Sequence, residues 1–270
     1  MSTFRETVKQ SLPPALLGVL RDTRDAWVRA QQWPAATLHP WRRESIRGLA
    51  NLKDKYKGER CFLIGNGPSL KITDMGRLKN EFTIGQNRIY LAFPDWGFAT
   101  SFYMSVNDLV IEQCQEDIQK LTMPKFVSWR ARKWLTPADD LYFIHTTYTG
   151  AKFAKDASER IWEGGTVTYS ALQIAYHLGF SQVILVGVDH NYVTQGKPNA
   201  TVVSEGADPN HFDPGYFGKG FRWQLPDLDS WVIAYNLARK TYEENGREVI
   251  DATIGGKLQV FKKVDYNSLF

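Results

Sequence analysis

Residues 61–71 read CFLIGNGPSLK, an apolar run that passes directly into a loop containing two glycines. A continuous apolar run suits a strand that is covered on both faces, as in a parallel sheet. Gly65 and Gly67 of the loop can bring backbone N–H groups close to a phosphate or a sugar. The stretch therefore predicts a buried strand of an α/β domain, with a ligand-binding loop at its carboxyl end.

Comparable apolar runs recur along the chain and alternate with helical segments. We expect strands at residues 61–65, 82–86, 101–106, 125–129, 141–145, 183–188 and 248–252. We expect long helices at about 168–178 and 229–245. This alternation predicts a Rossmann-like, doubly wound α/β fold with a mostly parallel sheet, whose ligand crevice lies at the carboxyl ends of the strands.

The excess positive charge is confined to the N-terminal part of the chain. Residues 1–50 hold eight Arg and Lys against four Asp and Glu, leaving 25 of each kind in residues 51–270. We therefore divide the chain into a basic, Trp-containing helical arm at 1–56 and a nucleotide-binding catalytic domain at 57–270. The arm can pack on the core of the protein itself, lie on an anionic membrane surface, or bind a partner.

The composition also bears on the compartment and the partners. No run approaches 18 apolar residues, and the N-terminal stretch lacks the features of a signal peptide. Cys61 and Cys114 offer neither a disulfide framework nor a metal quartet. We expect a cytoplasmic protein, with peripheral contact at the inner face of the membrane as one option for the arm. We expect no nucleic-acid partner, and a homo-oligomer is compatible with the sequence.

The loop after the first strand matches neither common nucleotide fingerprint. The dinucleotide-binding pattern needs a third glycine, and an acidic residue at the end of the second strand. That strand instead ends in Gln86, Asn87 and Arg88. No G-K-[ST] follows the first loop, so Lys71 is not placed as the lysine of a P-loop. The sequence therefore argues against NAD binding and against a Walker-type site.

Three asparagines follow successive predicted strands, namely Asn66, Asn87 and Asn107. Because the carboxyl ends of parallel strands meet at one edge of a sheet, we expect these amides to converge. Neutral amides suit a nucleoside base and ribose better than they suit a metal. Each asparagine taken alone also fits an ordinary turn, and Ser69 can cap the helix that follows the first loop.

A second polar cluster opens the predicted helix near residue 166. Two glycines at 164–165 are followed by Thr166, Thr168 and Ser170. Their hydroxyls and the free N–H groups of a helix start can attract the anionic part of a nucleotide. Ordinary N-capping is the alternative.

The strand at 183–188 is followed by Asp189 and His190. Such a pair in a crevice can bind Mg²⁺ or position a nucleophile, and capping of the loop is the alternative for Asp189. A later D-x-D at 227–229 opens a helix, so we expect its acids to cap that helix.

Residues 191–226 form a long irregular stretch of Gly, Pro, Asn and aromatic residues, which predicts an ordered lid. Within it, His211 is a candidate general base, because histidine alone has an unperturbed pKa near neutrality. Tyr216 and Lys219 can hold a leaving phosphate, and Trp223 belongs to the same aromatic set. A structural role is the alternative for His211.

Two longer stretches carry a resemblance to a known family. FLIGNGPSL with DMGRLKNEFTIGQNRIY, and later GTVTYSALQIAYHLGFSQVILVGVDHNY, resemble the bacterial DUF115 family of MptE-like proteins over about residues 57–195. The same stretches are more distantly similar to the family 42 sialyltransferases and to the central domain of flagellin-modifying, motility-associated factors.

The sialyltransferase resemblance implies a GT-A-like Rossmann variant that uses a CMP-activated nonulosonic acid and no essential D-x-D metal motif. By position, the nucleotide contacts of that family fall on Asn66, Asn87, Asn107 and residues 166–170. A lid tyrosine of the family falls near Tyr192. The place of its catalytic histidine falls nearer Trp223, with His211 upstream.

The archaeal MptE branch implies another reaction, the Mg²⁺-dependent transfer of diphosphate from ATP to a pterin alcohol. In that case Asp108 and Asp189 would be the metal ligands.

The leading hypothesis is a glycosyltransferase of surface-polysaccharide or glycoconjugate assembly. It would use a nucleotide sugar, CMP-linked by the resemblance, and a glycan or glycolipid acceptor, with no required cofactor. His211 would deprotonate the acceptor hydroxyl, while Tyr216, Lys219 and the helix start at 166–170 stabilise the departing phosphate. The alternatives are the Mg²⁺-dependent diphosphokinase and a non-catalytic nucleotide-binding scaffold that recruits partners through residues 1–50.

Overall fold

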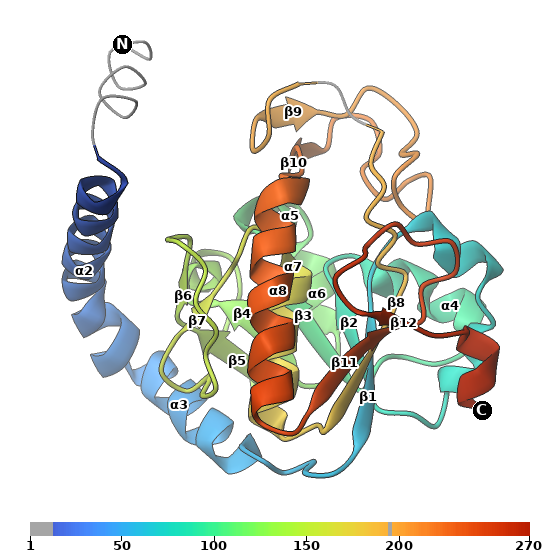
Figure 1. Cartoon of the computed structure of the whole chain (residues 1–270), viewed down its shortest axis with the longest axis horizontal. Coiled ribbons are helices and arrows are strands. Elements are labelled where there is room, and N and C mark those ends of the chain that lie inside the picture. Colours follow the sequence, from blue (N-terminus) through green and yellow to red (C-terminus); the bar gives the residue numbers. More distant parts are fainter. Residues whose placement is uncertain (1–12, 194–195) are drawn as a thin grey trace.

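The computed structural model describes residues 13–193 and 196–270 and shows a parallel sheet between layers of helices (Figure 1). Its eight strands follow the order β12-β11-β8-β1-β2-β3-β4-β5, and neighbouring strands pair in parallel. Their bounds are β1 Arg60–Ile64, β2 Thr83–Gln86, β3 Phe102–Ser105, β4 Lys125–Ser128, β5 Leu141–Ile144, β8 Gln182–Val186, β11 Glu248–Asp251 and β12 Lys262–Lys263. Two short pairs lie outside this sheet, β6 Thr146–Thr147 with β7 Ile161–Trp162, and β9 Thr201–Val203 with β10 Arg222–Gln224.

Helices cover the sheet and extend from it. The α-helices are α2 Pro14–Leu38, α3 Pro40–Leu52, α4 Phe93–Trp96, α5 Asp108–Gln113, α6 Gln115–Lys120, α7 Val167–Leu178 and α8 Leu228–Glu244. The 3₁₀ helices are η1 Pro68–Ile72, η2 Met75–Leu78, η3 Ile89–Ala92, η4 Trp129–Lys133 and η5 Tyr266–Leu269. The prediction of a Rossmann-like, doubly wound fold is confirmed, and each expected strand occurs within two residues of its expected ends. The short strands β6, β7, β9, β10 and β12 were not expected.

The central strand β1 shows why the sheet is buried on both faces. Cys61 and Leu63 belong to the apolar cluster that includes residues of α7 and α8, whereas Phe62 and Ile64 belong to the cluster on the other face. All four side chains are fully buried. Successive side chains of a strand point to opposite faces, so a continuous apolar run supplies both cores at once.

The order of the strands creates a topological switch point between β1 and β8. From β1 the chain runs outward to β5 and then returns to the other side of β1 to form β8, β11 and β12. The loops that leave β1 and β8 are therefore neighbours. The Gly65 N–H donates to the Val186 carbonyl over 2.8 Å, and the Gly67 N–H donates to the Gly187 carbonyl over 2.9 Å. Ligands of open parallel sheets bind at such a point.

The described part of the expected lid folds over this edge of the sheet, where β9 and β10 form a hairpin (Figure 1). Tyr216 and Phe217 of the lid form an apolar cluster with Val110 of α5. The side chain of Gln113, also in α5, pairs with both the N–H and the carbonyl of Arg222 over 2.9 Å. These contacts fix the lid to the body.

The N-terminal arm has two structurally different parts. α3 packs on the edge strand β5, where Ser45 Oγ accepts the Phe143 N–H over 3.0 Å. Buried Arg42 donates to the carbonyls of Ser158 and Glu159, so α3 is part of the packed body. α2 instead extends away from the body (Figure 1). In the described part of the chain, no helix is both long enough and apolar enough to span a bilayer.

Two glycines at helix ends offer a matched test of the packing. Gly179 ends α7 with a φ of 101°, and a Cβ there would lie 2.8 Å from the Cα of Asp54. Gly246 follows α8 with a φ of 66°, and a Cβ there would meet nothing within 4 Å. We expect Gly246→Ala to lower the free energy of unfolding by about 1 kcal/mol through left-handed strain. Gly179→Ala should lower it by about 3 kcal/mol, because a clash with backbone adds to that strain. Urea unfolding measures both, and equal losses would contradict the tight contact at Gly179.

Candidate functional site

A cavity of about 860 Å³ lies at the switch point, between the strand ends and the lid. Its walls come from the loops after β1, β2, β3, β6 and β8, the turn before α7, the lid and the first two turns of α8. The residues singled out in the sequence that line it are Gly65, Asn66, Gly67, Asn87, Asn107, Thr166, Thr168, Asp189, His190, Tyr192, His211, Tyr216 and Trp223. The structure thus brings these residues, which span more than 150 positions of the chain, into one crevice.

The glycines of the first loop are required by the neighbouring loop. A Cβ on Gly65 would lie 2.3 Å from the Gly187 carbonyl oxygen, and a Cβ on Gly67 would lie 1.8 Å from Oδ2 of Asp189. Both distances are far inside van der Waals contact, so any side chain would push the two loops apart. Glycine is therefore needed at these positions because the two loops pack closely, in addition to the close approach of a ligand that the sequence led us to expect.

Asp189 joins the same two loops by hydrogen bonds. Its Oδ1 accepts from the N–H of Ser69 over 3.0 Å, and its Oδ2 accepts from the Ser69 hydroxyl over 2.7 Å. Burial raises the pKa of Asp189, and the two hydrogen bonds from Ser69 oppose that rise. Asp189 therefore serves the structure of the crevice as well as lining it.

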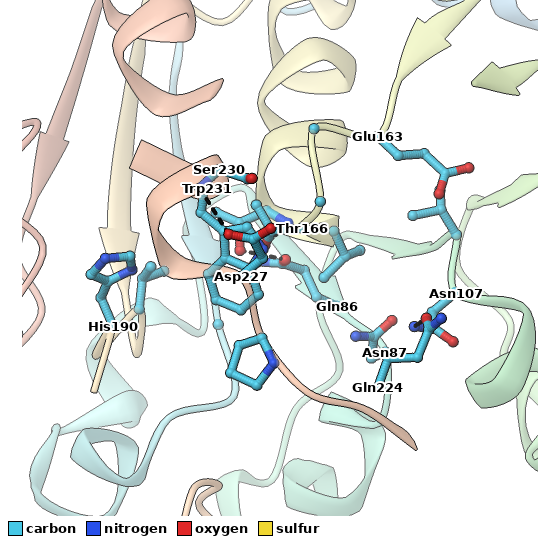
Figure 2. A pocket seen from close by; sticks show the side chains of 18 of the residues that line it. Gln86, Asn87, Asn107, Glu163, Thr166, His190, Gln224, Asp227, Ser230 and Trp231 are labelled. Atoms are coloured by element: carbon cyan, nitrogen blue, oxygen red, sulfur yellow. Dashed lines mark hydrogen bonds between the residues drawn. The ribbon is translucent and has the colours of Figure 1, made fainter. Parts of the chain in front are cut away.

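The three asparagines differ in how much of each amide the protein already uses. The buried Oδ1 of Asn66 has no hydrogen-bond partner among the described residues. Asn87 has a φ of 49°, and its Oδ1 accepts from the Ser105 hydroxyl over 3.0 Å. Asn107 caps α5, and its amide nitrogen lies 3.5 Å from Oε1 of Gln224 in β10. Figure 2 shows Asn87, Asn107 and Gln224 close together at one side of the cavity. Asn66 and Asn87 thus keep amide atoms that bond no described residue, whereas Asn107 is largely a cap.

The start of α7 forms another wall. Gly164 and Gly165 have φ values of 56° and 82°, which favour glycine. Thr166 then caps the helix by accepting the Thr168 N–H over 3.3 Å. The Thr168 hydroxyl donates to Oε1 of buried Gln86 over 3.0 Å. This turn opens the positive end of the α7 dipole toward the cavity, a setting that favours an anion.

The lid carries a histidine that a buried carboxylate orients. Nδ1 of His211 lies 2.6 Å from Oδ2 of Asp208, and both residues are buried. The His211 ring stacks on that of Tyr216 with centroids 3.9 Å apart. The N–H of Phe212 donates to the Asn66 carbonyl over 2.9 Å, which ties this part of the lid to the first loop. With Nδ1 donating to Asp208, Nε2 is left as a proton acceptor, as in a general base.

Arg88, in the loop after β2, makes further hydrogen bonds to the lid. Its guanidinium donates to the carbonyls of Gly215 and Tyr216, and its N–H donates to the Tyr216 hydroxyl over 3.3 Å. Arg88 directly follows Asn87, so the same loop bonds the lid and supplies an amide side chain to the cavity wall.

His190 and Tyr192 form an aromatic corner with Trp231 of α8. The ring centroids of His190 and Tyr192 lie 6.1 Å and 5.6 Å from that of Trp231. Burial lowers the pKa of His190, and its buried Nδ1 has no partner among the described residues. His190 is therefore neutral near pH 7 and suits hydrogen bonding to a polar ligand.

The wall opposite this corner is held by Arg130. Its guanidinium bonds Glu163 over 2.8 Å and Asp108 over 2.9 Å, and it lies 4.4 Å from the ring centroid of Tyr148. Burial alone would lower the pKa of Arg130, but the charge of Glu163, with lesser contributions from Tyr148 and Asp108, raises it overall. Burial raises the pKa of Glu163. Glu163 and Tyr148 line the cavity, and Arg130 fixes both.

Four expected site residues are not part of the cavity lining: Ser69, Asp108, Ser170 and Lys219. Ser69 and Ser170 are buried, and Lys219 is exposed on the lid. Asp108 is held by Arg130 and Asp189 by the first loop, so the two carboxylates expected to bind Mg²⁺ do not fit a shared site. In the described residues no group of three His, Cys, Asp or Glu is arranged to hold a metal.

The sequence reasoning missed several residues of the site: Gln86, Glu163, Asp208, Gln224 and Trp231. Two of them had a local signal. Gln86 directly precedes Asn87 at the same strand end, and Asp208 stands three residues before His211. Asp227 was expected only as a helix cap; it caps α8 by accepting the Ser230 N–H and also lines the cavity (Figure 2).

Comparison with known proteins adds two findings. The family described as 6-hydroxymethylpterin diphosphokinase MptE-like matches residues 42–195. The solved structure of the MAf glycosyltransferase from Magnetospirillum magneticum AMB-1 matches 96% of this chain with a TM-score of 0.51 and 14% sequence identity. The chain spans 43% of that protein, and at this identity the likeness is one of fold. No protein with a curated description matches the chain.

Two buried serines test the loop contact. The Ser69 hydroxyl bonds Asp189, whereas the Ser170 hydroxyl has no partner within the described residues. We expect Ser69→Ala to lower the free energy of unfolding at neutral pH by about 2 kcal/mol, because a buried carboxylate loses a donor. The control Ser170→Ala removes no hydrogen bond to a described residue and should not lower the free energy of unfolding.

The loss in Ser69→Ala should also depend on pH. Folding raises the pKa of Asp189, so its contribution to stability is present below the unfolded pKa and is lost as pH rises through the folded pKa. Removing the Ser69 hydroxyl raises the folded pKa further. The variant should therefore lose stability more steeply than the wild type between about pH 4 and pH 7. Urea unfolding across this range measures the difference, and a loss that is the same at every pH would contradict it.

Proposed function

The chain belongs to the MptE-like family, whose match covers more than half of it, and we propose that it is a glycosyltransferase with a CMP-linked donor of the nonulosonic acid type. Its acceptor would be a glycan or glycolipid of surface-polysaccharide or glycoconjugate assembly. The observation that carries the proposal is the Asp208–His211 pair, an oriented base in a lid above a cavity walled by amides. The fold shared with a glycosyltransferase supports it.

The charges of the cavity favour a donor with one phosphate. Lys152 is the only lysine or arginine among the described residues that line it. The carboxylates of Glu163, Asp189 and Asp227 line it as well. Chains of two or three phosphates call for more positive charge than one lysine and one helix start supply. A nucleoside monophosphate linked to a sugar fits this balance better.

In the proposed reaction the acceptor hydroxyl oxygen bonds to the anomeric carbon, and the bond from that carbon to the phosphate oxygen breaks. Nε2 of His211 takes the hydroxyl proton, and Asp208 stabilises the imidazolium that forms. CMP leaves with the electron pair of the broken bond. Its charge is received by the N–H groups at the start of α7 and by Lys152. Tyr216, which stacks on His211, orients the base.

The amides of the cavity would recognise the nucleoside. The unpaired Oδ1 of Asn66 can accept from a ribose hydroxyl or an exocyclic amine. The side-chain nitrogen of Asn87 donates to no other described residue and can bond a carbonyl or ring nitrogen of the base. These roles correspond to those that the resemblance implies.

The diphosphokinase of the family description is the alternative. It would use ATP and Mg²⁺. The aspartates expected to hold that metal bond Arg130 and Ser69 instead, which weighs against it. A scaffold that binds a nucleotide without turnover is the remaining alternative.

A thermal-shift panel of CMP, CDP, UDP, GDP and ATP, each with and without Mg²⁺, separates these functions. We expect CMP to raise the Tm without Mg²⁺, since a ligand at 100 times its Kd stabilises the fold by about 2.7 kcal/mol. Stabilisation by ATP with Mg²⁺ but not by CMP would favour the diphosphokinase. CMP binding without turnover of any CMP-sugar would favour the scaffold, and no response to any nucleotide would exclude both enzymes.

The orientation of the base is tested by Asp208→Asn, which keeps the size of the side chain. An amide can hold the ring with the proton on Nε2, which removes the base, so we expect kcat to fall about 10²- to 10⁴-fold while KM for the donor changes little. Asp213→Asn, which alters another lid carboxylate, is the matched control and should retain near wild-type kcat. Release of CMP from a CMP-sugar measures both, and an unchanged kcat in Asp208→Asn would remove the pair from the mechanism.

A further inference from the structure

Several large apolar side chains of helix α2 are exposed, and four of them lie on one side of the helix. Leu16, Leu20, Trp27 and Leu38 are 45%, 52%, 62% and 57% exposed. The spacings from Leu16 to Leu20, Trp27 and Leu38 are each close to a whole number of helical turns of about 3.6 residues, as is the spacing from Leu20 to Trp27. They therefore form one apolar stripe along the helix, and we call it the outer stripe.

A different side of α2 makes the contacts with the body. Ala36 is buried, and Val28, two turns earlier, is half-buried. Between them, the Gln32 side-chain oxygen lies 3.3 Å from Nε2 of His145. Residues spaced by four share one side of a helix, and at about 100° per residue this side is turned well away from the outer stripe. The exposed side chains of the outer stripe therefore do not belong to the side of α2 that faces the body.

The chemistry of the arm indicates what the outer stripe contacts. Trp and Leu on one side of a helix, with basic residues elsewhere on it, are typical of helices that lie in the boundary between lipid head groups and acyl chains. The arm is also where the positive charge is: residues 1–50 carry eight basic and four acidic residues, and the remaining chain is balanced. Anionic lipid attracts such a segment. Two copies of the arm carry like net charge, which opposes pairing of one arm with another.

We propose that the outer stripe of α2 docks on an anionic membrane surface, with the helix lying in the plane of the interface. This binding is independent of the chemistry in the cavity. It would place the catalytic body beside a lipid-linked acceptor, although the docking does not depend on that function.

Vesicle co-sedimentation of the full chain tests the proposal. The probes are vesicles of phosphatidylcholine alone and vesicles that contain phosphatidylglycerol as well. We expect binding to the anionic vesicles, weakened by added salt. The double substitution Leu20→Ala with Trp27→Ala should weaken it more than about tenfold, since two large apolar side chains no longer enter the interface. The matched control is Ile72→Ala with Val203→Ala, which alters side chains that are 70% and 59% exposed elsewhere, and it should bind as the wild type does.

Three results would overturn the proposal. The first is absence of binding to anionic vesicles, and the second is binding that the Leu20 and Trp27 substitutions leave unchanged. The third is a dimer, detected by light scattering, that the same two substitutions dissociate while vesicles bind neither form. That last result would identify a second copy of the chain as the occupant of the outer stripe. All four substituted side chains are exposed, so the variants are expected to fold.

Discussion

The contact between the loops that leave β1 and β8 determines the geometry of the whole crevice. Gly65 and Gly67 lie so close to Gly187 and Asp189 that neither can carry a side chain. Two hydrogen bonds from Ser69 to Asp189 then hold the loops together. The lid is attached to the same point, because Phe212 donates to the carbonyl of Asn66. The wall formed by these loops and the lid above the cavity are therefore positioned by the same contact.

Many polar groups around the cavity serve the fold, and fewer remain for a ligand. Asn107 caps α5, Thr166 caps α7, and Asp227 caps α8. The groups without an internal partner among the described residues include Oδ1 of Asn66 and Nδ1 of His190. Because a buried polar atom without a partner costs free energy, such atoms are better indicators of ligand contact than residue type alone.

The sequence predicted those parts of the structure that depend on local patterns. Apolar runs predicted seven strands of the main sheet, and the helix expected to end at about residue 178 does end there, at the left-handed Gly179. Burial on both faces and glycine caps each leave a pattern within a few residues. The hairpin of β9 and β10 left no such mark, since it pairs Val202 with Trp223 across the lid.

The candidate site was predictable to the same extent. Strand-end asparagines and the lid histidine could be named, because a parallel sheet brings strand ends together. The resemblance to the MptE branch implied Asp108 as a metal ligand, but in the structure its carboxylate pairs with Arg130, which lies 22 residues later. Glu163 joins the same guanidinium from 33 residues away. Such ion pairs arise from tertiary packing and leave no pattern in a single sequence.

His211, the proposed general base, belongs to the lid and not to the sheet. In the proposed reaction, the group that activates the acceptor is therefore put in place by the same segment that covers the donor. A sugar donor in an uncovered cavity would face water without a base beside it to deprotonate that water. If the proposed reaction holds, the position of His211 in the lid would favour transfer to an acceptor over hydrolysis of the donor, without a separate residue for that selection.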